Sequence, residues 1–174
     1  MKIEVEAIGP LGHSFEFLIG PDIFETATSG FRLSAPARFS GLVEKREHGA
    51  VVAGNIRGEI EVQCARCLAK VYQPLDIEVS AEFLNKEDFG SGENAELGPN
   101  DLDADVLDDG EIDLSALAAE QILLNVPEQY FCRPDCKGLC DKCGADLNLV
   151  DCSCGTGPID PRWAGLKKLK DDGK

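Results

Sequence analysis

The sequence predicts an α+β protein: an antiparallel β-sheet or small barrel with a helix, an acidic loop and a C-terminal cysteine-rich zinc module. Three observations support this fold class. Apolar and polar residues alternate through much of residues 39–84, as in strands with one buried face. The period becomes helical after Asp113, and six of the eight cysteines then fall between Cys132 and Cys154. The 174 residues are 43% hydrophobic, which is enough for one core.

The clearest strand runs from Leu75 to Phe83, where every second residue is apolar. Residues 56–62 alternate in the same way, and residues 39–45 and 50–54 are weaker candidates with a turn at His48-Gly49. Residues 39–84 are therefore expected to form an antiparallel meander. The N-terminal strip is expected to add an edge strand through Ile3, Val5 and Ala7, whereas residues 10–38 carry no clear pattern.

Acidic residues concentrate between residues 82 and 113, where twelve carboxylates face one base, Lys86. Within this run, residues 85–112 are rich in Gly, Asn and Asp and have no steady period, so we expect an acidic flexible loop. It divides the chain into a β domain, residues 1–84, and a part of residues 113–174 that packs on the sheet. The loop has two possible roles. It is a solvated connection, or it docks a partner, as a binding segment for a basic protein or as a mimic of nucleic acid.

A helix is expected after the loop because Asp113 can cap its first turn and Pro127 can end it. Five residues fall at helical spacing along one face, and Leu124 is expected to continue this largely apolar stripe: Leu114, Leu117, Ala118, Gln121 and Ile122. A terminal helix is expected to begin near Asp160-Pro161, with an apolar stripe of Trp163, Leu166 and Leu169.

The cysteines carry the chemistry of this sequence. Cys140 and Cys143 form a C-x-x-C-G knuckle with Gly144, and Cys152 and Cys154 can complete a tetrahedral shell around zinc. The remaining four predict a second site, in which the tip of a hairpin is joined to the C-terminal module: Cys64, Cys67, Cys132 and Cys136. We therefore expect two structural Zn²⁺ per chain, although the crowded spacing leaves open a grouping that exchanges Cys136 with Cys140.

The cysteines also allow chemistry other than zinc binding. Disulfides fit the even count, but no signal peptide accompanies them. A redox pair at Cys64 and Cys67 and an iron–sulfur cluster remain alternatives to zinc. His13 and His48 stand far from any cysteine pair and are expected at the surface rather than among the ligands.

Charge restricts the partners. The formal charge is −15, which opposes broad binding to nucleic acid. Eight bound thiolates and two Zn²⁺ would move that charge to about −19. Local RNA contact is therefore expected only in the C-terminal module, which carries Arg133, Lys137, Lys142, Arg162, Lys167, Lys168 and Lys170.

The sequence contains none of the common motifs of hydrolases, nucleotide-binding enzymes or zinc proteases, so we expect no enzyme activity. It has no apolar run of the roughly 20 residues that cross a membrane, and its first residues are acidic and interrupted. We therefore expect a cytoplasmic protein with no membrane partner.

Four segments resemble the YceD family, the large ribosomal RNA subunit accumulation proteins, in order and spacing. They are Cys64-Ala-Arg-Cys67-Leu68, Gly110-Glu-Ile-Asp113-Leu114, CKGLCDKCGADLN followed by C-S-C-G, and DPRWAGLKKL. The resemblance spans about residues 36–170. It implies a non-catalytic bacterial or plastid protein that supports maturation or accumulation of large-subunit ribosomal RNA.

The sequence and the resemblance together predict a non-catalytic, zinc-binding ribosome-biogenesis factor that supports processing or accumulation of 23S rRNA. Its expected partner is a precursor large ribosomal subunit or a basic ribosomal protein. The alternatives are a thiol redox or metal-responsive switch, in which a thiol would have to be exposed and acidic, and a general acidic adaptor for basic proteins, which would depend on the acidic loop.

Overall fold

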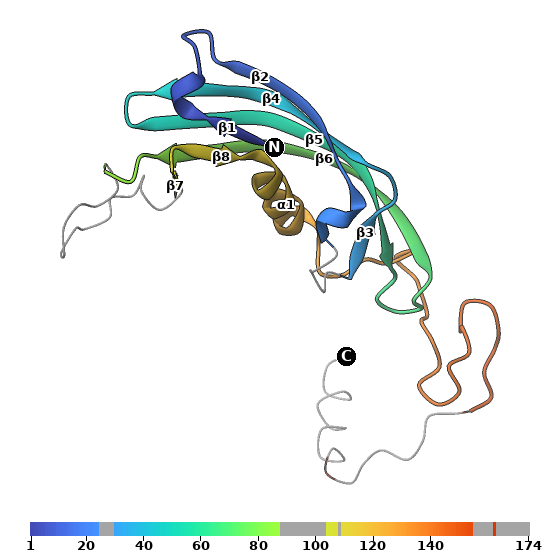
Figure 1. The fold of residues 1–174 in the computed structure, drawn as a ribbon. Coiled ribbons are helices and arrows are strands. Elements are labelled where there is room, and N and C mark those ends of the chain that lie inside the picture. The colour runs from blue at the N-terminus through green and yellow to red at the C-terminus, as the bar shows by residue number, and fades with distance from the viewer. Residues whose placement is uncertain (25–29, 88–103, 108, 155–161, 163–174) are drawn as a thin grey trace.

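The described part of the chain forms a long curved sheet with one helix on its concave side and a cysteine-rich segment beyond one end (Figure 1). The computed structural model describes residues 1–24, 30–87, 104–107, 109–154 and 162. The predicted α+β class is confirmed for these residues. The predicted terminal helix, with Trp163 and the lysines at 167, 168 and 170, lies outside them.

Three long strands form the centre of the sheet, and they are the predicted antiparallel meander. They are β4 (Ala37–Arg46), β5 (Gly49–Gln63) and β6 (Lys70–Leu84). The strand candidates at residues 50–54 and 56–62 are one strand, because their apolar residues are in phase along β5. The predicted turn at His48-Gly49 joins β4 to β5.

Residues 10–38, which the sequence pattern left unassigned, extend the sheet. Strand β2 (His13–Ile19) pairs with β4, and the 3₁₀ turn η2 (Pro21–Phe24) follows it. Strand β3 (Phe31–Leu33) pairs with residues 60–62 of β5, beyond the start of β4, whose first residues pair with β5 at Arg57. The pairing with β5 slips by two residues between β3 and β4, at Ser34–Pro36, where the proline has no N–H for the ladder.

The sheet is mixed, which corrects the prediction of a wholly antiparallel one. Strand β7 (Ala104–Val106) pairs in parallel with β6. A parallel neighbour needs a connection of a dozen or more residues, and residues 85–103 are long enough to return the chain to the same end. The structure thus places β7 and the start of β8 (Glu111–Asp113) within the expected acidic loop, of which residues 88–103 and 108 lie outside the described part.

The N-terminal strip does not join the main sheet, so the predicted edge strand there is wrong. Strand β1 (Lys2–Glu4) pairs with β8 in a separate two-stranded sheet. The 3₁₀ turn η1 (Val5–Ala7) ends the strand, and the Val5 N–H donates to the Gly110 carbonyl at 3.0 Å. Ile3 and Val5 are nevertheless buried, because the small sheet shares the core of the large one.

Helix α1 (Leu114–Asn125) has the predicted cap and end. The carboxylate of Asp113 accepts from the N–H groups of Ser115 and Ala116, at 2.9 and 3.2 Å. The helix stops two residues before Pro127. Its buried residues are Leu114, Leu117, Ala118 and Ile122, whereas Leu124 is 71% exposed and does not continue the stripe as predicted. At 100° per residue, Leu124 lies about 90° from the centre of the stripe, at its margin.

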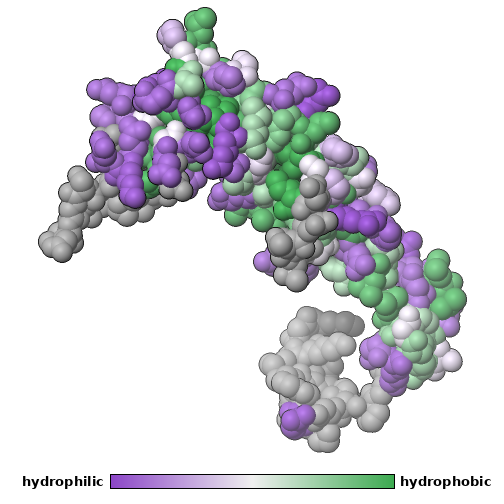
Figure 2. Space-filling model, in the orientation of Figure 1, coloured by the Kyte–Doolittle hydropathy of each residue, from purple (hydrophilic) through white to green (hydrophobic). Residues whose placement is uncertain are grey.

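One apolar core fills the space between the concave face of the sheet, α1 and the β1–β8 pair. Phe39 and Ile56, partners across β4 and β5, are fully buried in it. Phe15 packs its ring edge-on against Phe39 at 4.8 Å between centroids. In the view of Figure 2, hydrophilic residues gather at the β1–β8 end, and hydrophobic ones continue toward the cysteine-rich end. Among the described residues, no helix is long and apolar enough to cross a membrane.

Candidate metal centres

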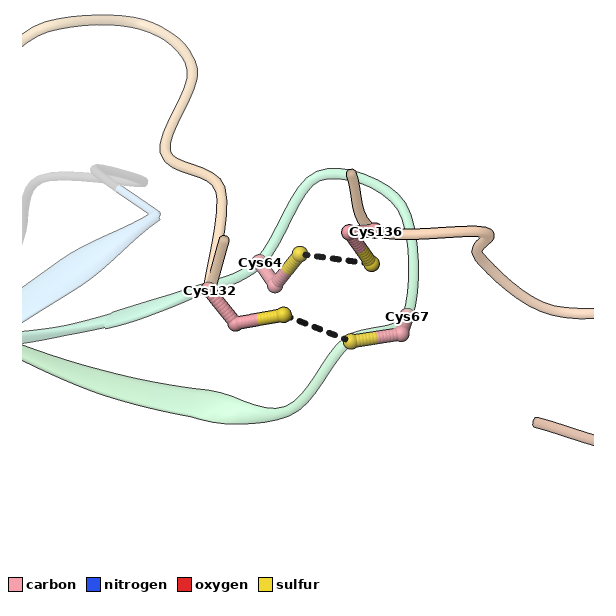
Figure 3. A group of neighbouring side chains, drawn as sticks. All are labelled: Cys64, Cys67, Cys132 and Cys136. Carbon is pink, nitrogen blue, oxygen red and sulfur yellow. Dashed lines mark hydrogen bonds between the residues drawn. The ribbon is translucent and has the colours of Figure 1, made fainter. Parts of the chain in front are cut away.

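The tip of the β5–β6 hairpin meets the chain that follows α1 at four cysteines (Figure 3). Cys64 and Cys67 come from the hairpin tip, and Cys132 and Cys136 come from the C-terminal segment. We call these four residues the inner tetrad. Backbone bonds align the two segments, because the Ala65 N–H donates to the Tyr130 carbonyl at 2.7 Å and Cys64 and Tyr130 form a bridge. Cys64, Cys67 and Cys136 are buried, and Cys132 is exposed.

The sulfur positions of the inner tetrad fit a tetrahedral metal ion. All four sulfurs lie within 4.8 Å of one another. The contacts between Cys64 and Cys136 and between Cys67 and Cys132 measure 3.8 and 3.6 Å. Four sulfurs about 2.3 Å from one Zn²⁺ would be about 3.8 Å apart, whereas a disulfide needs about 2.05 Å. All eight cysteines are free thiols in the structure, so the disulfide alternative is not observed.

A second cluster, the outer tetrad, comprises Cys140, Cys143, Cys152 and Cys154. Its sulfurs meet the same 4.8 Å limit, and the Cys152 sulfur lies 3.4 Å from that of Cys140 and 3.5 Å from that of Cys143. Only Cys140 is buried; Cys143 and Cys154 are exposed. The outer tetrad therefore has sulfur separations like those of the inner one, but it comes from one stretch of chain and more of its cysteines are exposed.

The two C-x-x-C turns have the same backbone. In the outer tetrad the Gly144 N–H donates to the Cys140 carbonyl at 2.9 Å, and Gly144 has a φ of 71°. In the inner tetrad the Leu68 N–H donates to the Cys64 carbonyl, also at 2.9 Å, and Leu68 has a φ of 59°. Each turn is a knuckle that directs backbone N–H groups toward its sulfurs. The sequence revealed the knuckle at Gly144 but not the one at Leu68, because a leucine rarely adopts a left-handed conformation.

Arg66 fixes the C-terminal segment over the hairpin tip. Its Nη1 donates to the carbonyls of Cys136 and Pro134, at 2.9 and 3.2 Å, and its guanidinium lies 4.6 Å from the centre of the Phe131 ring. The Arg66 carbonyl in turn accepts from the Leu139 N–H at 3.2 Å. These contacts hold the backbone of the C-terminal segment, including that of the ligand residue Cys136, against the hairpin tip. Sequence reasoning missed Arg66, since an arginine between two cysteines also fits an exposed turn.

The thiols of each tetrad differ in acidity. Backbone N–H groups of Cys67 and Cys132 lower the pKa of Cys64 to about 6, and those of Cys143 and Lys142 lower the pKa of Cys140 to about 7. Desolvation and the neighbouring thiols raise the pKa of Cys132 to about 12, and the neighbouring sulfurs do the same for Cys154. Without a cation, each tetrad therefore holds thiolate and thiol side by side, because close negative charges cannot all form.

The structure brings together the eight predicted ligand residues in the two predicted groups of four. The alternative grouping, which exchanged Cys136 with Cys140, is not the one observed. His13 and His48 are exposed and belong to neither tetrad, as expected. The donor sets fit zinc, since four thiolates in tetrahedral array are a usual structural site for this ion. They leave no ligand position for a reacting water.

A family model described as "Large ribosomal RNA subunit accumulation protein YceD" matches residues 52–170, a range that contains both tetrads. The chain is 29% identical to the uncharacterised protein YlbN of Bacillus subtilis, over 90% of this chain and 88% of that protein.

Two other relatives are longer than this chain. An uncharacterised protein of Mycobacterium tuberculosis is 32% identical over 73% of this chain and 58% of its own length. A chloroplastic protein of Zea mays, named large ribosomal RNA subunit accumulation protein YCED homolog 1, is 29% identical over 73% of this chain and 51% of its own length. The chain thus spans little more than half of these two relatives. No solved structure matches it.

Proposed function

We propose that this chain, which belongs to the YceD family of large ribosomal RNA subunit accumulation proteins, is a non-catalytic, zinc-binding factor in the biogenesis of the large ribosomal subunit. It supports the processing or accumulation of 23S rRNA in the cytoplasm. The family match is the evidence for the ribosomal role, and the two tetrads are the evidence for zinc binding.

The geometry of the tetrads supports a structural role for zinc. An ion in the inner tetrad takes two ligands from the β5–β6 hairpin and two from the segment after α1, so it ties the C-terminal segment to the sheet. All four positions of each ion are filled by thiolates, whereas a catalytic zinc keeps one position for water or substrate. A non-catalytic factor is consistent with this arrangement.

The charge distribution supports a basic ribosomal protein as the direct partner on the precursor large subunit. A hollow of about 380 Å³ lies between β7, β8, β1 and α1. Among the described residues, one base, Lys2, and five acids line it: Asp105, Asp109, Glu111, Asp113 and Glu120. Lys2 pairs with Glu111 at 2.9 Å, and Asp113 caps α1 and lies 3.9 Å from the N-terminal ammonium group, so the negative charge available to a partner comes mainly from Asp105, Asp109 and Glu120. Such a surface attracts a Lys- or Arg-rich segment and repels phosphate.

Co-sedimentation with precursor large subunits tests the proposal. We expect weaker binding when the acids of the hollow are neutralised as Asp105→Asn, Asp109→Asn and Glu120→Gln. The matched control removes the same charge elsewhere, as Glu47→Gln, Glu78→Gln and Glu128→Gln, and is expected to bind like the wild type. A further variant, with Lys167, Lys168 and Lys170 changed to Gln, probes local rRNA contact.

The three variants give distinct results. Loss only with the hollow variant supports docking on a basic protein. Loss only with the lysine variant, steeply dependent on salt, assigns the contact to rRNA phosphates instead. Wild-type protein that never co-sediments with precursor particles, at low or moderate salt, would refute a direct role at the ribosome.

The exposure of Cys143 and Cys154 favours a second candidate, a metal-responsive switch. In that case binding to precursor particles would depend reversibly on metal in the outer tetrad. The same sedimentation assay, with a chelator added and zinc then restored, separates a switch from a permanently structural centre.

A further inference from the structure

We propose that Asn148 couples the two metal centres, so that an ion in the outer tetrad strengthens the binding of an ion in the inner tetrad, and the reverse. This inference rests on the proposed binding of metal by both tetrads. It adds a positioning residue that is not itself a ligand, and it makes the two centres one cooperative unit.

In the sequence, Asn148 lies between ligand residues of the outer tetrad. It lies in the loop that joins Cys143 to Cys152, so an ion in the outer tetrad holds both ends of this loop. The loop has little apolar support of its own, because Leu149 is 81% and Val150 52% exposed. Its order therefore depends on the ion and on a few hydrogen bonds.

The side chain of Asn148, in contrast, contacts the inner tetrad. Its Nδ2 donates to the Cys136 sulfur of the inner tetrad at 3.4 Å. Its Oδ1 accepts from the Lys137 N–H at 2.8 Å and from Nη2 of Arg133 at 2.7 Å. These two donors fix the orientation of the amide, because the oxygen must face them and the nitrogen then faces the sulfur.

The base of the loop holds Asn148 in this position. The Asp146 carboxylate accepts from the Asn148 N–H at 2.8 Å and from its Nδ2 at 2.6 Å. The Leu147 N–H donates to the Gly138 carbonyl at 2.9 Å, and Leu139 forms a bridge with Asp146. The loop of the outer tetrad is therefore docked on residues 137–139, directly after the last ligand of the inner tetrad.

Coupling follows from these contacts. An N–H that donates to a ligating thiolate stabilises its negative charge and orients its lone pairs toward the metal. Asn148 can do this only when the loop is ordered, and the outer ion orders the loop. Binding of the first ion therefore includes the entropic cost of ordering the loop, and the second ion binds to a loop that is already ordered. By thermodynamic linkage, each ion must raise the affinity for the other by the same factor.

A double-mutant cycle on the full chain tests the coupling. Four proteins are compared: the wild type, Asn148→Ala, the pair Cys143→Ser with Cys154→Ser, and the combination of all three changes. Zn²⁺ is titrated in competition with a chromophoric chelator. The amide signal of Leu68 reports the inner tetrad, and that of Gly144 reports the outer tetrad. Leu149→Ala, one residue along the same loop, is the matched control.

We expect Asn148→Ala to lower the zinc affinity of the inner tetrad by about 10- to 100-fold, the usual effect of losing such a hydrogen bond. Removal of the outer ligands should lower it by a similar factor, and the combined variant should lose no more than the larger single loss. Leu149→Ala should bind like the wild type. Asn148→Asp, which keeps the shape but points a carboxylate at the sulfur, should lose at least as much as Asn148→Ala.

Other results would overturn the coupling. Losses that multiply in the combined variant, or an inner affinity that ignores the outer ligands, would show independent centres. Amide exchange in β5 should be unchanged in the Asn148 variants, which shows that the sheet remains folded. If Asn148→Ala unfolds the C-terminal segment, the zinc affinity of Asn148→Asp is the deciding measurement. A wild type that binds no zinc at either signal refutes the metal proposal itself, whereas two bound ions with independent losses refute only the coupling.

Discussion

Leu68 occupies the same position in the C-x-x-C turn of the inner tetrad as Gly144 does in that of the outer tetrad. The two residues have φ values of 59° and 71°, and both follow a C-x-x-C pair. A left-handed conformation costs a residue with a Cβ roughly 1–2 kcal/mol, and glycine avoids this cost. The inner knuckle is thus strained in its backbone, and the outer one is not.

The difference predicts opposite effects of matched substitutions. Leu68→Gly should keep or raise the zinc affinity of the inner tetrad, because the backbone strain is relieved and Leu68 is 57% exposed. Gly144→Ala should lower that of the outer tetrad by about tenfold, the equivalent of roughly 1.4 kcal/mol, because the turn acquires the strain. Zinc competition on both variants measures this. A tenfold loss from Leu68→Gly would show that the leucine side chain matters more than its backbone.

At the scale of elements, two glycines let the long strands of the sheet approach closely. Gly41 on β4 and Gly54 on β5 face each other across the ladder. A Cβ on Gly41 would lie 2.3 Å from the Ala53 carbonyl oxygen, and one on Gly54 would lie 2.6 Å from that of Ser40. The obstacles are backbone atoms, so a side chain could be admitted only if the strands moved apart.

We therefore predict that Gly41→Ala and Gly54→Ala each destabilise the protein by about 1–3 kcal/mol, the range for overpacking. Gly9→Ala is the control, since a Cβ there meets no atom within 4 Å. Urea denaturation followed by circular dichroism gives the three values. A cost for Gly54→Ala no larger than that for Gly9→Ala would contradict the close approach.

Elements with a strict local period could be predicted, and those defined by distant partners could not. The alternation along β5 and β6 and the cap at Asp113 are local signals, and the structure confirms them. Strand β7 has three residues and depends on a parallel partner 22 residues earlier. Likewise β1 ends at Glu4 because β8 offers only three residues to pair with. The length of β8 cannot be read from the N-terminal sequence, so the end of β1 could not be predicted from it.

The metal centres show the same division. The spacing of the cysteines allowed the two groups of four to be predicted, because ligand pairs at short separation are geometrically constrained. Arg66 and Asn148 could not be predicted, since each contacts Cys136 from elsewhere in the chain, Arg66 at its carbonyl and Asn148 at its sulfur. Residues that surround a ligand follow from the packing of segments, which spacing alone does not give.

On the scale of the whole molecule, metal, protons and folding are linked. Cys132 and Cys154, whose pKa is raised to about 12, keep their protons at neutral pH in the metal-free protein. Zinc binds thiolates, so it must displace these protons, and lower pH must weaken its binding. The segment after α1 should therefore lose its attachment to the sheet as the pH falls.

We predict two zinc ions per chain by elemental analysis at pH 8, and release of protons when zinc is added to the metal-free protein in dilute buffer. Chelator should remove both ions more readily at pH 6 than at pH 8. Cys64→Ser should retain one ion and lose hydrogen-exchange protection beyond residue 130, whereas the β4–β5 ladder stays protected. One zinc or none in the wild type, with all eight thiols reacting freely, would refute the assignment of two centres.

The inner tetrad joins cysteines that are far apart in the order of synthesis. Sixty-five residues separate Cys67 from Cys132. At about 5–20 residues per second, a translating ribosome needs roughly 3–13 seconds to pass from one to the other. For that time the hairpin tip presents two thiols with no partners. If the inner tetrad binds zinc as proposed, it can do so only after Cys132 and Cys136 are made, when every described strand has already been synthesised.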